Sequence, residues 1–512
     1  MLNTLLSGAP ESAPMRAAAS FYDQGLKLSS EGRHLEAIGC FEAALSGAPE
    51  SPQILFALGN TASALGMPGP AELFFRRVLQ AEPGRIEALV NLGNLLRASG
   101  GFEAAIVLLR PAAIQNPQSP DLALTLGSAY RECGDETNAV YCYRAALAAR
   151  PGFVPALVNL ADILSDAGER EEARTLYDNA IRREPDNAQA RLNRAILHLL
   201  NGDLKDGWRD YEARLAVPGK VPVSEQRLPA WNGSLKNTRL LVRAEQGVGD
   251  QILFASLIPD LLKQARAEGG SVILECEPRL VSLFARSLPG ATVKPARFRS
   301  VGGQVLADYD WLKQAGGANA AVPMGSLPKY LRPALENFPA DHTFLVPDAD
   351  EKANWKSVFG ERAIGLCWRS GKSGGHRSLQ YAPLEAWGAF IRDLPGTPVC
   401  VQYDATAEEI IALEQISGRR IIVPAGIDQK QELDRACALM SALDAVVTAP
   451  TAVAWAAAGA GVLTLKLLYD TSWTALGQDH EPFAPSCLCV MPHLRGDWTD
   501  TFEKAKGLIA RL

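Results

Sequence analysis

Three short loops of this sequence carry residue types that could do chemistry on an anionic substrate. They are Arg243-Ala-Glu-Gln-Gly-Val-Gly-Asp250, Trp368-Arg-Ser-Gly-Lys-Ser-Gly-Gly-His-Arg377 and Thr448-Ala-Pro-Thr451. Each loop follows a short β-rich run and precedes a helical pattern. In open parallel α/β sheets, ligands bind beyond the carboxyl ends of the strands, where loops of this kind lie.

The first loop combines glycines with carboxylates. Gly247 and Gly249 permit a tight turn that exposes backbone amides to a bound phosphate, and Asp250 stands at the start of the next helix. Asp250 is a candidate general base for an acceptor hydroxyl, and Glu245 is a second candidate. A helix cap is the alternative use of Asp250. The third glycine of a dinucleotide fingerprint is missing.

The second loop is rich in cations and glycine. Its basic residues are Arg369, Lys372, His376 and Arg377. Their donors could stabilise the negative charge on a leaving phosphate or diphosphate. The loop does not fit the spacing GxxxxGK[ST] of a P-loop. The alternative interpretation is a solvated loop without a ligand.

The third loop joins an apolar strand to a helix of small residues. The free amides at a helix N-terminus bind phosphate readily, and the helix dipole favours negative charge there. Thr448 and Thr451 could add hydroxyl donors. In the alternative interpretation, Thr451 only caps the helix and Pro450 sets the direction of the chain.

A 34-residue repeat organises the first half of the chain. Prolines recur at this interval at Pro49, Pro83, Pro117, Pro151 and Pro185. Three further series keep the same interval: Gly25, Gly59, Gly93 and Gly127; Ala37, Ala71, Ala105, Ala139 and Ala173; Phe41, Phe75, Tyr143 and Tyr177. Small residues let paired helices approach closely, the aromatic fills the space between them, and proline ends the second helix. This pattern is typical of tetratricopeptide repeats.

The repeats are predicted over residues 18–215, as about six units after an N-terminal segment at 1–17. The sixth unit carries Gly207, Trp208, Tyr211 and Glu212 in place of the usual small-residue helix, as expected of a terminal repeat that docks on something else. Solenoids bind protein partners in a concave groove. Its candidate contact residues are Asn60, Asn91, Asn94, Asn159 and Asn193. The alternative is that these asparagines hydrogen-bond neighbouring helices.

The second half alternates strand and helix patterns after a proline-rich linker at 216–230. Strands are predicted at 239–243, 272–275, 364–368, 398–402, 420–423 and 445–448, and helices at 252–263, 279–287, 384–391, 407–417, 434–442 and 452–458. This alternation predicts parallel α/β sheets. Two such blocks, 231–345 and 346–512, indicate two Rossmann-like lobes with a ligand cleft between them.

Composition excludes several classes of protein. The 512 residues include 51 basic and 57 acidic ones, a net charge of −6, so nucleic-acid binding is not expected. No apolar run is long enough for a membrane span, and no secretory signal is evident. The nine scattered cysteines form neither a disulfide framework nor a zinc motif. We therefore expect a cytoplasmic protein without a bound metal.

The order of these motifs resembles that of bacterial tetratricopeptide-repeat glycosyltransferases, whose two-lobed catalytic region has the GT-B fold of lipopolysaccharide heptosyltransferases. The similar segments are Ala244–Asp250, Ser326-Leu-Pro328, Gly365-Leu-Cys-Trp-Arg369 and Leu443–Thr451, and the resemblance spans essentially the whole chain. Heptosyltransferases usually carry an aspartate and a histidine around the third loop, where this chain has Pro450 and Trp455. A heptose donor is therefore not expected.

The forms Trp-Arg-Ser-Gly and Ala-Pro-Thr look closer to the subgroup that modifies flagellin with nonulosonic acids from cytidine-monophosphate donors. The resemblance implies a metal-independent protein O-glycosyltransferase without a cofactor, which transfers sugar to Ser or Thr of a protein held by the repeats. Its sugar nucleotide would bind the 346–512 lobe, and its acceptor would face the 231–345 lobe. Two alternatives stay open: transfer of N-acetylglucosamine from a uridine-diphosphate donor, and a non-catalytic repeat scaffold.

Overall fold

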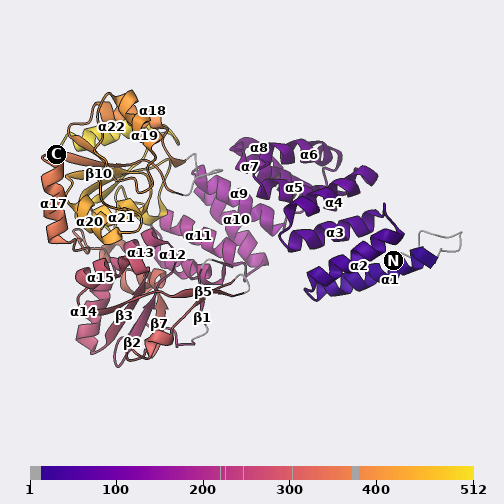
Figure 1. Cartoon of the computed structure of the whole chain (residues 1–512), viewed down its shortest axis with the longest axis horizontal. Helices are drawn as coiled ribbons and strands as arrows, with labels where there is room; N and C mark the ends of the chain where they lie inside the picture. The colour runs from indigo at the N-terminus through magenta and orange to yellow at the C-terminus, as the bar shows by residue number, and fades with distance from the viewer. Residues whose placement is uncertain are drawn as a thin grey trace. The chain divides into compact units, whose positions relative to one another are not determined.

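The computed structural model describes residues 13–219, 221–224, 227–245, 247–301, 304–371 and 380–511. The chain divides into two compact units, Met1–Ala167 and Gly168–Leu512 (Figure 1). Where it is described, the first unit is helical, and the second contains the last repeat helices and the α/β lobes. This architecture confirms the predicted fold class of a repeat solenoid followed by parallel α/β sheets.

The first unit consists of successive antiparallel helices (Figure 1). They are α1 (Ala13–Ser30), α2 (His34–Gly47), α3 (Pro52–Ala64), α4 (Pro68–Ala81), α5 (Ile86–Ala98), α6 (Phe102–Gln115), α7 (Pro120–Glu132), α8 (Glu136–Ala149) and α9 (Val154–Asp166). Gly32, Gly66, Gly100 and Gly134, each 34 residues after the last, follow the first helix of each pair with positive φ of 68–83°. Only glycine adopts this left-handed turn at no steric cost.

The close approach predicted from the small residues is confirmed. A Cβ atom at Gly25 would lie 2.6 Å from the ring of Phe41, and one at Gly59 would lie 2.6 Å from the ring of Phe75. The third repeat uses a smaller side chain for the same purpose, because a Cβ atom at Gly93 would lie 2.7 Å from Leu109. In these three repeats, glycine therefore stands where the bulky residue of the second helix crosses the first.

The second unit begins with α10 (Arg170–Arg183), α11 (Ala188–Leu200), α12 (Leu204–Tyr211) and the 3-10 turn Glu212–Ala216. The aromatic residues of α12 pack inside this unit. The ring centroid of Trp208 lies 6.5 Å from that of Trp473 and 6.3 Å from that of Phe483, and Tyr211 lies 5.4 Å from Trp473. This packing agrees with the expectation that the sixth repeat docks on something else, and the surface it meets belongs to the second lobe.

The first lobe is built on a parallel sheet with the strand order β4-β3-β2-β7. Its strands and helices are β2 (Arg239–Arg243), α13 (Val248–Ala255), α14 (Ile258–Glu268), β3 (Ser271–Cys276), α15 (Val281–Ser287), β4 (Ala291–Pro295), β7 (Ala320–Pro323) and α16 (Leu327–Leu331). The single helix predicted at 252–263 is wrong, because the chain turns at Ser256–Leu257 and Pro259 lies in the first turn of α14. Proline fits a helix start and not a helix interior. A small sheet, β1 (Val223–Ser224), β6 (Gln304–Ala307) and β5 (Phe298–Val301), completes this part of the chain.

The second lobe is a parallel sheet with the order β12-β11-β10-β8-β9. Its elements are α17 (Ala349–Phe359), β8 (Ala363–Cys367), α18 (Leu384–Arg392), β9 (Thr397–Cys400), α19 (Ala407–Ser417), α20 (Leu433–Ser441), β10 (Ala445–Thr448), α21 (Ala452–Gly459), β11 (Leu463–Leu467), β12 (Cys487–Val490) and α22 (Trp498–Ile509). The strand predicted at 420–423 is wrong, since that segment contributes only one bridge, Ile422 to Val399.

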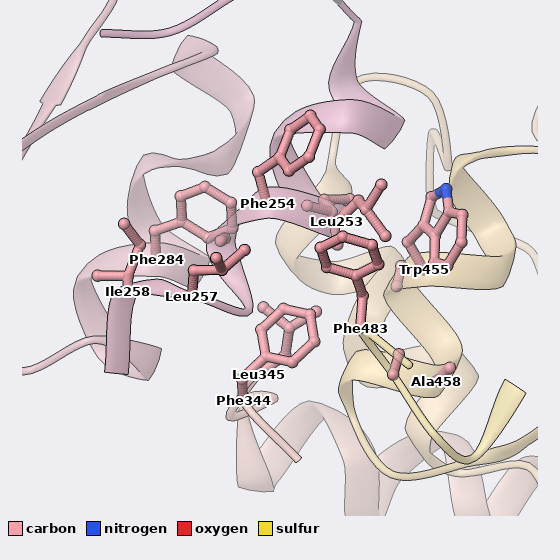
Figure 2. Close-up of a cluster of buried hydrophobic side chains, with 14 of the residues drawn as sticks. Leu253, Phe254, Leu257, Ile258, Phe284, Phe344, Leu345, Trp455, Ala458 and Phe483 are labelled. Carbon is pink, nitrogen blue, oxygen red and sulfur yellow. The ribbon is translucent and has the colours of Figure 1, made fainter. Parts of the chain in front are cut away.

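A continuous apolar core joins the two lobes (Figure 2). Figure 2 shows Leu253 and Phe254 of α13 opposite Trp455 of α21, with Phe483 between the two lobes. The rings of Phe254 and Phe483 meet edge to face with centroids 6.0 Å apart. This core holds the starts of α13 and α21 close together. No helix among the described residues is long and apolar enough to cross a membrane.

Candidate functional site

A cavity of about 370 Å³ lies between the two lobes, at the carboxyl ends of their strands. It is lined by Val248, Gly249, Ile252, Arg279, Leu280, Leu283, Ser370, Gly371, Val401, Tyr403, Gln429, Lys430, Leu433, Ala436, Met440, Thr451, Ala452, Val453 and Ala456. In the first sheet the strand order reverses at β2, and in the second sheet it reverses between β8 and β10. The loops that follow these three strands all reach the cavity. Such switch points are where open α/β sheets bind ligands.

Two helix N-termini converge on this cavity. A Cβ atom at Gly249, in the first turn of α13, would lie 3.5 Å from the Cα atom of Ala452, the first residue of α21. The side chain of Thr451 caps α21 by accepting a hydrogen bond from Val453 N–H at 3.3 Å. Because both helices direct free amides and the positive ends of their dipoles to one place, the wall suits an anion.

The two threonines of the third loop differ in position. Thr451 lines the cavity, whereas Thr448 is fully buried and its hydroxyl donates to the carbonyl oxygen of Ala449 at 2.8 Å. The prediction of Thr448 as a phosphate ligand does not agree with this position. Its oxygen lies 3.4 Å from that of Thr451, so it supports the residue that does face the cavity.

Asp250 takes part in capping α13. Its carboxylate accepts a hydrogen bond from the backbone N–H of Gly247 at 3.2 Å, and Gly247 is the exposed N-cap residue. This agrees with the alternative interpretation of Asp250 as a helix cap. The side chain is half-buried, at the start of the helix whose next turn lines the cavity.

Glu245 forms a buried ion pair with Arg214, and this position does not suit a general base. Its oxygens accept hydrogen bonds from Arg214 Nε at 3.0 Å and Nη2 at 2.7 Å, and also from the backbone N–H of Gly325. Only 1% of each charged side chain is exposed. Arg214 also donates to the hydroxyl of Ser326 at 2.9 Å. The pair therefore fastens the end of the last repeat to the first lobe.

Arg369 is likewise held by carboxylates. Its Nε and Nη2 atoms donate to Glu409 at 2.5 and 2.8 Å, and Nη1 donates to Asp404 at 2.9 Å. A guanidinium paired in this way positions its own loop, so the geometry does not agree with a direct contact between Arg369 and phosphate. The predicted ligands Lys372, His376 and Arg377 lie outside the described residues.

Several cavity residues were missed by the sequence analysis. Tyr403 follows β9, and its hydroxyl accepts a hydrogen bond from the backbone N–H of Gly371 at 2.6 Å. Arg279 reaches from the first lobe to the second, where Nη1 donates to the carbonyl oxygen of Lys430 at 2.7 Å. Their place directly after strands β9 and β3 is the signal that could have found them. Among the described residues, no group of three His, Cys, Asp or Glu side chains is placed to hold a metal ion.

A buried carboxyl lies beside the first loop. Glu275, at the end of β3, accepts hydrogen bonds from Ala244 N–H at 3.0 Å and from the hydroxyl of Tyr309 at 3.1 Å, both through Oε2. Oε1 is buried without a hydrogen-bond partner among the described residues. Burial raises the pKa of Glu275 to about 7. The carboxyl therefore titrates near neutral pH, next to the strand end that leads into Gly247–Asp250.

The predicted groove asparagines lie on first helices of repeats. In the first unit, the amide of Asn91 donates to Asn60 at 2.7 Å, and that of Asn159 lies 3.5 Å from the hydroxyl of Ser128. Asn94 accepts from Arg97 at 2.8 Å. In the second unit, Asn193 accepts from Gln189. These contacts agree with the alternative that asparagines bond neighbouring side chains, while Asn60 and Asn94 stay exposed.

The chain combines a series of paired helices with a two-lobed α/β unit that holds a cavity between its lobes. Residues 15–186 match a family described as tetratricopeptide repeat, and residues 158–219 match a second family with the same description. The two matches together place tetratricopeptide repeats over residues 15–219, and repeats of this kind are known for binding protein partners.

The protein FlbA of Caulobacter vibrioides is 31% identical over 324 residues. The match covers 62% of this chain and 54% of FlbA, so the chain spans about half the length of this curated relative. Among solved structures, PilF of Pseudomonas aeruginosa is similar over 41% of this chain and 95% of its own, with 20% identity and a TM-score of 0.36. A repeat protein of Thermus thermophilus is similar over 36% of this chain and all of its own, with 25% identity and a TM-score of 0.31.

Proposed function

We propose that this chain is a protein O-glycosyltransferase that transfers a sugar from a nucleotide donor to Ser or Thr of a protein held by the repeats. The observation that carries the proposal is the interlobe cavity at which α13 and α21 start, because a leaving phosphate needs such fixed positive ends. The apolar wall around Leu433 and Met440, with Tyr403 beside it, suits a nucleobase.

In this proposal the reaction is a displacement at the sugar carbon. The acceptor hydroxyl forms a new bond to that carbon, the bond from carbon to the phosphate oxygen breaks, and the phosphate keeps the electron pair. Amides at the starts of α13 and α21 and the hydroxyl of Thr451 stabilise the phosphate. Asp250 takes the proton of the acceptor hydroxyl.

The donor and acceptor are proposed from the resemblance of the second and third loops to flagellin-modifying transferases: a cytidine-monophosphate nonulosonic acid and flagellin. The nine cysteines are free, which supports work in a reducing compartment such as the cytoplasm. A scaffold without catalysis is the second candidate, favoured by the commitment of Glu245 and Arg369 to ion pairs.

A nucleotide-binding panel on the full chain tests the proposal. Calorimetry with cytidine monophosphate and with uridine, adenosine and guanosine diphosphates should show selective binding of the cytidine nucleotide. Ala456→Trp, which fills the cavity, should weaken binding about tenfold or more, whereas Ala353→Trp on the exposed face of α17 should not. Selective uridine binding would assign an N-acetylglucosamine donor instead, and a folded chain that binds none would be a scaffold.

The two threonines of the third loop provide a matched pair of variants. Thr451→Val removes a hydroxyl that faces the cavity, and we expect about tenfold weaker nucleotide binding, the effect of losing a hydrogen bond to a charged group. Thr448→Val removes a buried hydroxyl and should leave the affinity within about twofold. Calorimetric titration measures both. Equal losses would contradict the assignment of Thr451 as the phosphate ligand.

A further inference from the structure

The outer helices of the first unit carry a row of exposed apolar side chains. Leu73 on α4, Val107 on α6 and Tyr141 on α8 are spaced 34 residues apart, so they occupy the same place in three successive repeats. Their exposed fractions are 59%, 75% and 74%. Single exposed apolar residues are ordinary, but here the same repeat position carries one in three successive repeats.

A row of arginines runs beside the apolar row. Arg76, Arg110 and Arg144 each come three residues after one of the apolar residues, and all are exposed. Residues three apart on a helix lie on the same face, so each arginine adjoins an apolar neighbour. We call these six residues the outer stripe.

The outer stripe has defined ends in the sequence. One repeat earlier, the equivalent positions are Gly39 and Glu42, and one repeat later they are Thr175 and Asp178. The combination of an apolar residue with arginine is thus confined to α4, α6 and α8, and both flanking positions carry an acid.

Packing within the first unit does not account for the outer stripe. The buried residues of α4 are Ala71, Phe75 and Val78, which face the neighbouring helices. On α6 the exposed face is extended by Ile114, which is 74% exposed and seven residues after Val107. The groove asparagines of this unit lie on α3, α5 and α9, which are first helices of repeats, so the outer stripe is a separate surface.

The chemistry of the outer stripe specifies its partner. Tyrosine and arginine are enriched among the residues that dominate protein interfaces. Arginine pairs best with carboxylates through paired hydrogen bonds, and Arg76 already binds one carboxylate, since its Nε donates to Glu72 of its own helix at 2.8 Å. An exposed pair of this kind exchanges readily for a carboxylate of a partner, since it gains little in water.

We propose that the outer stripe of α4, α6 and α8 (Figure 1) is a docking surface for an acidic segment of a partner protein that also carries apolar side chains. The apolar side chains of that segment cover Leu73, Val107 and Tyr141, and its Asp or Glu residues pair with the three arginines. A bare polyanion fits less well, because the arginines alternate with apolar groups that gain from burial.

The test uses the full chain and two labelled helical peptides of leucine and alanine, one with glutamate beside the leucine face and one with lysine at the same positions. Fluorescence anisotropy should show binding of the glutamate peptide, weakened by added salt, and no comparable binding of the lysine peptide. The triple variant Arg76→Glu, Arg110→Glu, Arg144→Glu should weaken binding about tenfold or more. Leu73→Ser, Val107→Ser, Tyr141→Ser should weaken it similarly.

A triple variant of equal charge change provides the control. Arg33, Arg150 and Arg174 are about half exposed, and their replacement by glutamate should leave peptide binding within about twofold. Equal binding of both peptides, or equal losses in both arginine variants, would overturn the proposal. Binding to phosphatidylserine vesicles without peptide binding would overturn it too. A dimer of the chain that the outer-stripe variants dissociate would assign the surface to a second copy.

Discussion

Replacing Arg214 with methionine should lower the free energy of unfolding of the Gly168–Leu512 unit by about 3–5 kcal/mol. The reason is that Glu245 would remain charged and buried without its partner, with only the N–H of Gly325 to compensate. The large cost reflects the desolvated charge left behind and not the net contribution of the pair. Differential scanning calorimetry of the full chain measures the loss as an earlier transition of this unit.

Two further variants separate this explanation from a general effect of losing an arginine. Arg174→Met removes a guanidinium that is 47% exposed and paired with the exposed Glu171 of the same unit, so we expect a change within about 0.5 kcal/mol. The double variant Arg214→Met, Glu245→Leu removes both buried charges and should recover much of the stability. A double variant as unstable as Arg214→Met would contradict the buried-charge explanation.

The second large effect is a loss of stability as pH rises through neutrality. Glu275 has its pKa raised to about 7 by burial, whereas its value in the unfolded chain is about 4.5. Between these values the folded state holds a proton that the unfolded state has released, so stability falls as pH rises. The contribution of Glu275 to the free energy of unfolding is fully present below about pH 4.5. About 3 kcal/mol of it is lost once the pH exceeds about 7.

Glu275→Gln should remove this pH dependence, because the amide does not titrate. At pH 8 the variant should then be more stable than the parent chain by up to about 3 kcal/mol. Glu336→Gln changes an exposed carboxyl and should leave the profile unchanged. Thermal melts of all three chains between about pH 4.5 and pH 8 test the prediction. If the stability of Glu275→Gln changed with pH in the same way as that of the parent chain, the prediction would be contradicted.

Elements set by local pattern could be predicted closely from the sequence. The strands at 239–243 and 445–448 and the helix at 407–417 have the predicted bounds, because apolar runs and caps are short-range features. The segment at 420–423 has a similar β-rich composition, but its pairing is decided by distant neighbours. In that segment only Ile422 forms a β-bridge, with Val399. The turn glycines at 32, 66, 100 and 134 were a periodic signal that went unused.

Residues of the candidate site could be predicted only where their place at the start of a helix after a strand brings them to the cavity. Gly249 and Thr451 line the cavity because both come at helix starts after strands of the two sheets. Two charged candidates, Glu245 and Arg369, are instead held in ion pairs, since the partner of a charge depends on residues far along the chain. Glu409 is 40 residues from Arg369, and Arg214 is 31 residues from Glu245. No sequence motif with a fixed spacing predicts such ion pairs.

The boundary between the two compact units bears on how such proteins could diversify. The last repeat helices belong to the unit of the α/β lobes through Trp208 and the Arg214–Glu245 pair, so the exchangeable module ends at Ala167 and not where the repeat pattern ends. The residues that line the cavity all belong to the second unit, after Ala167. Exchange of the first unit would change the surface that the repeats offer to a partner while the proposed site in the second unit keeps its residues, and a chimera joined at residue 167 tests this.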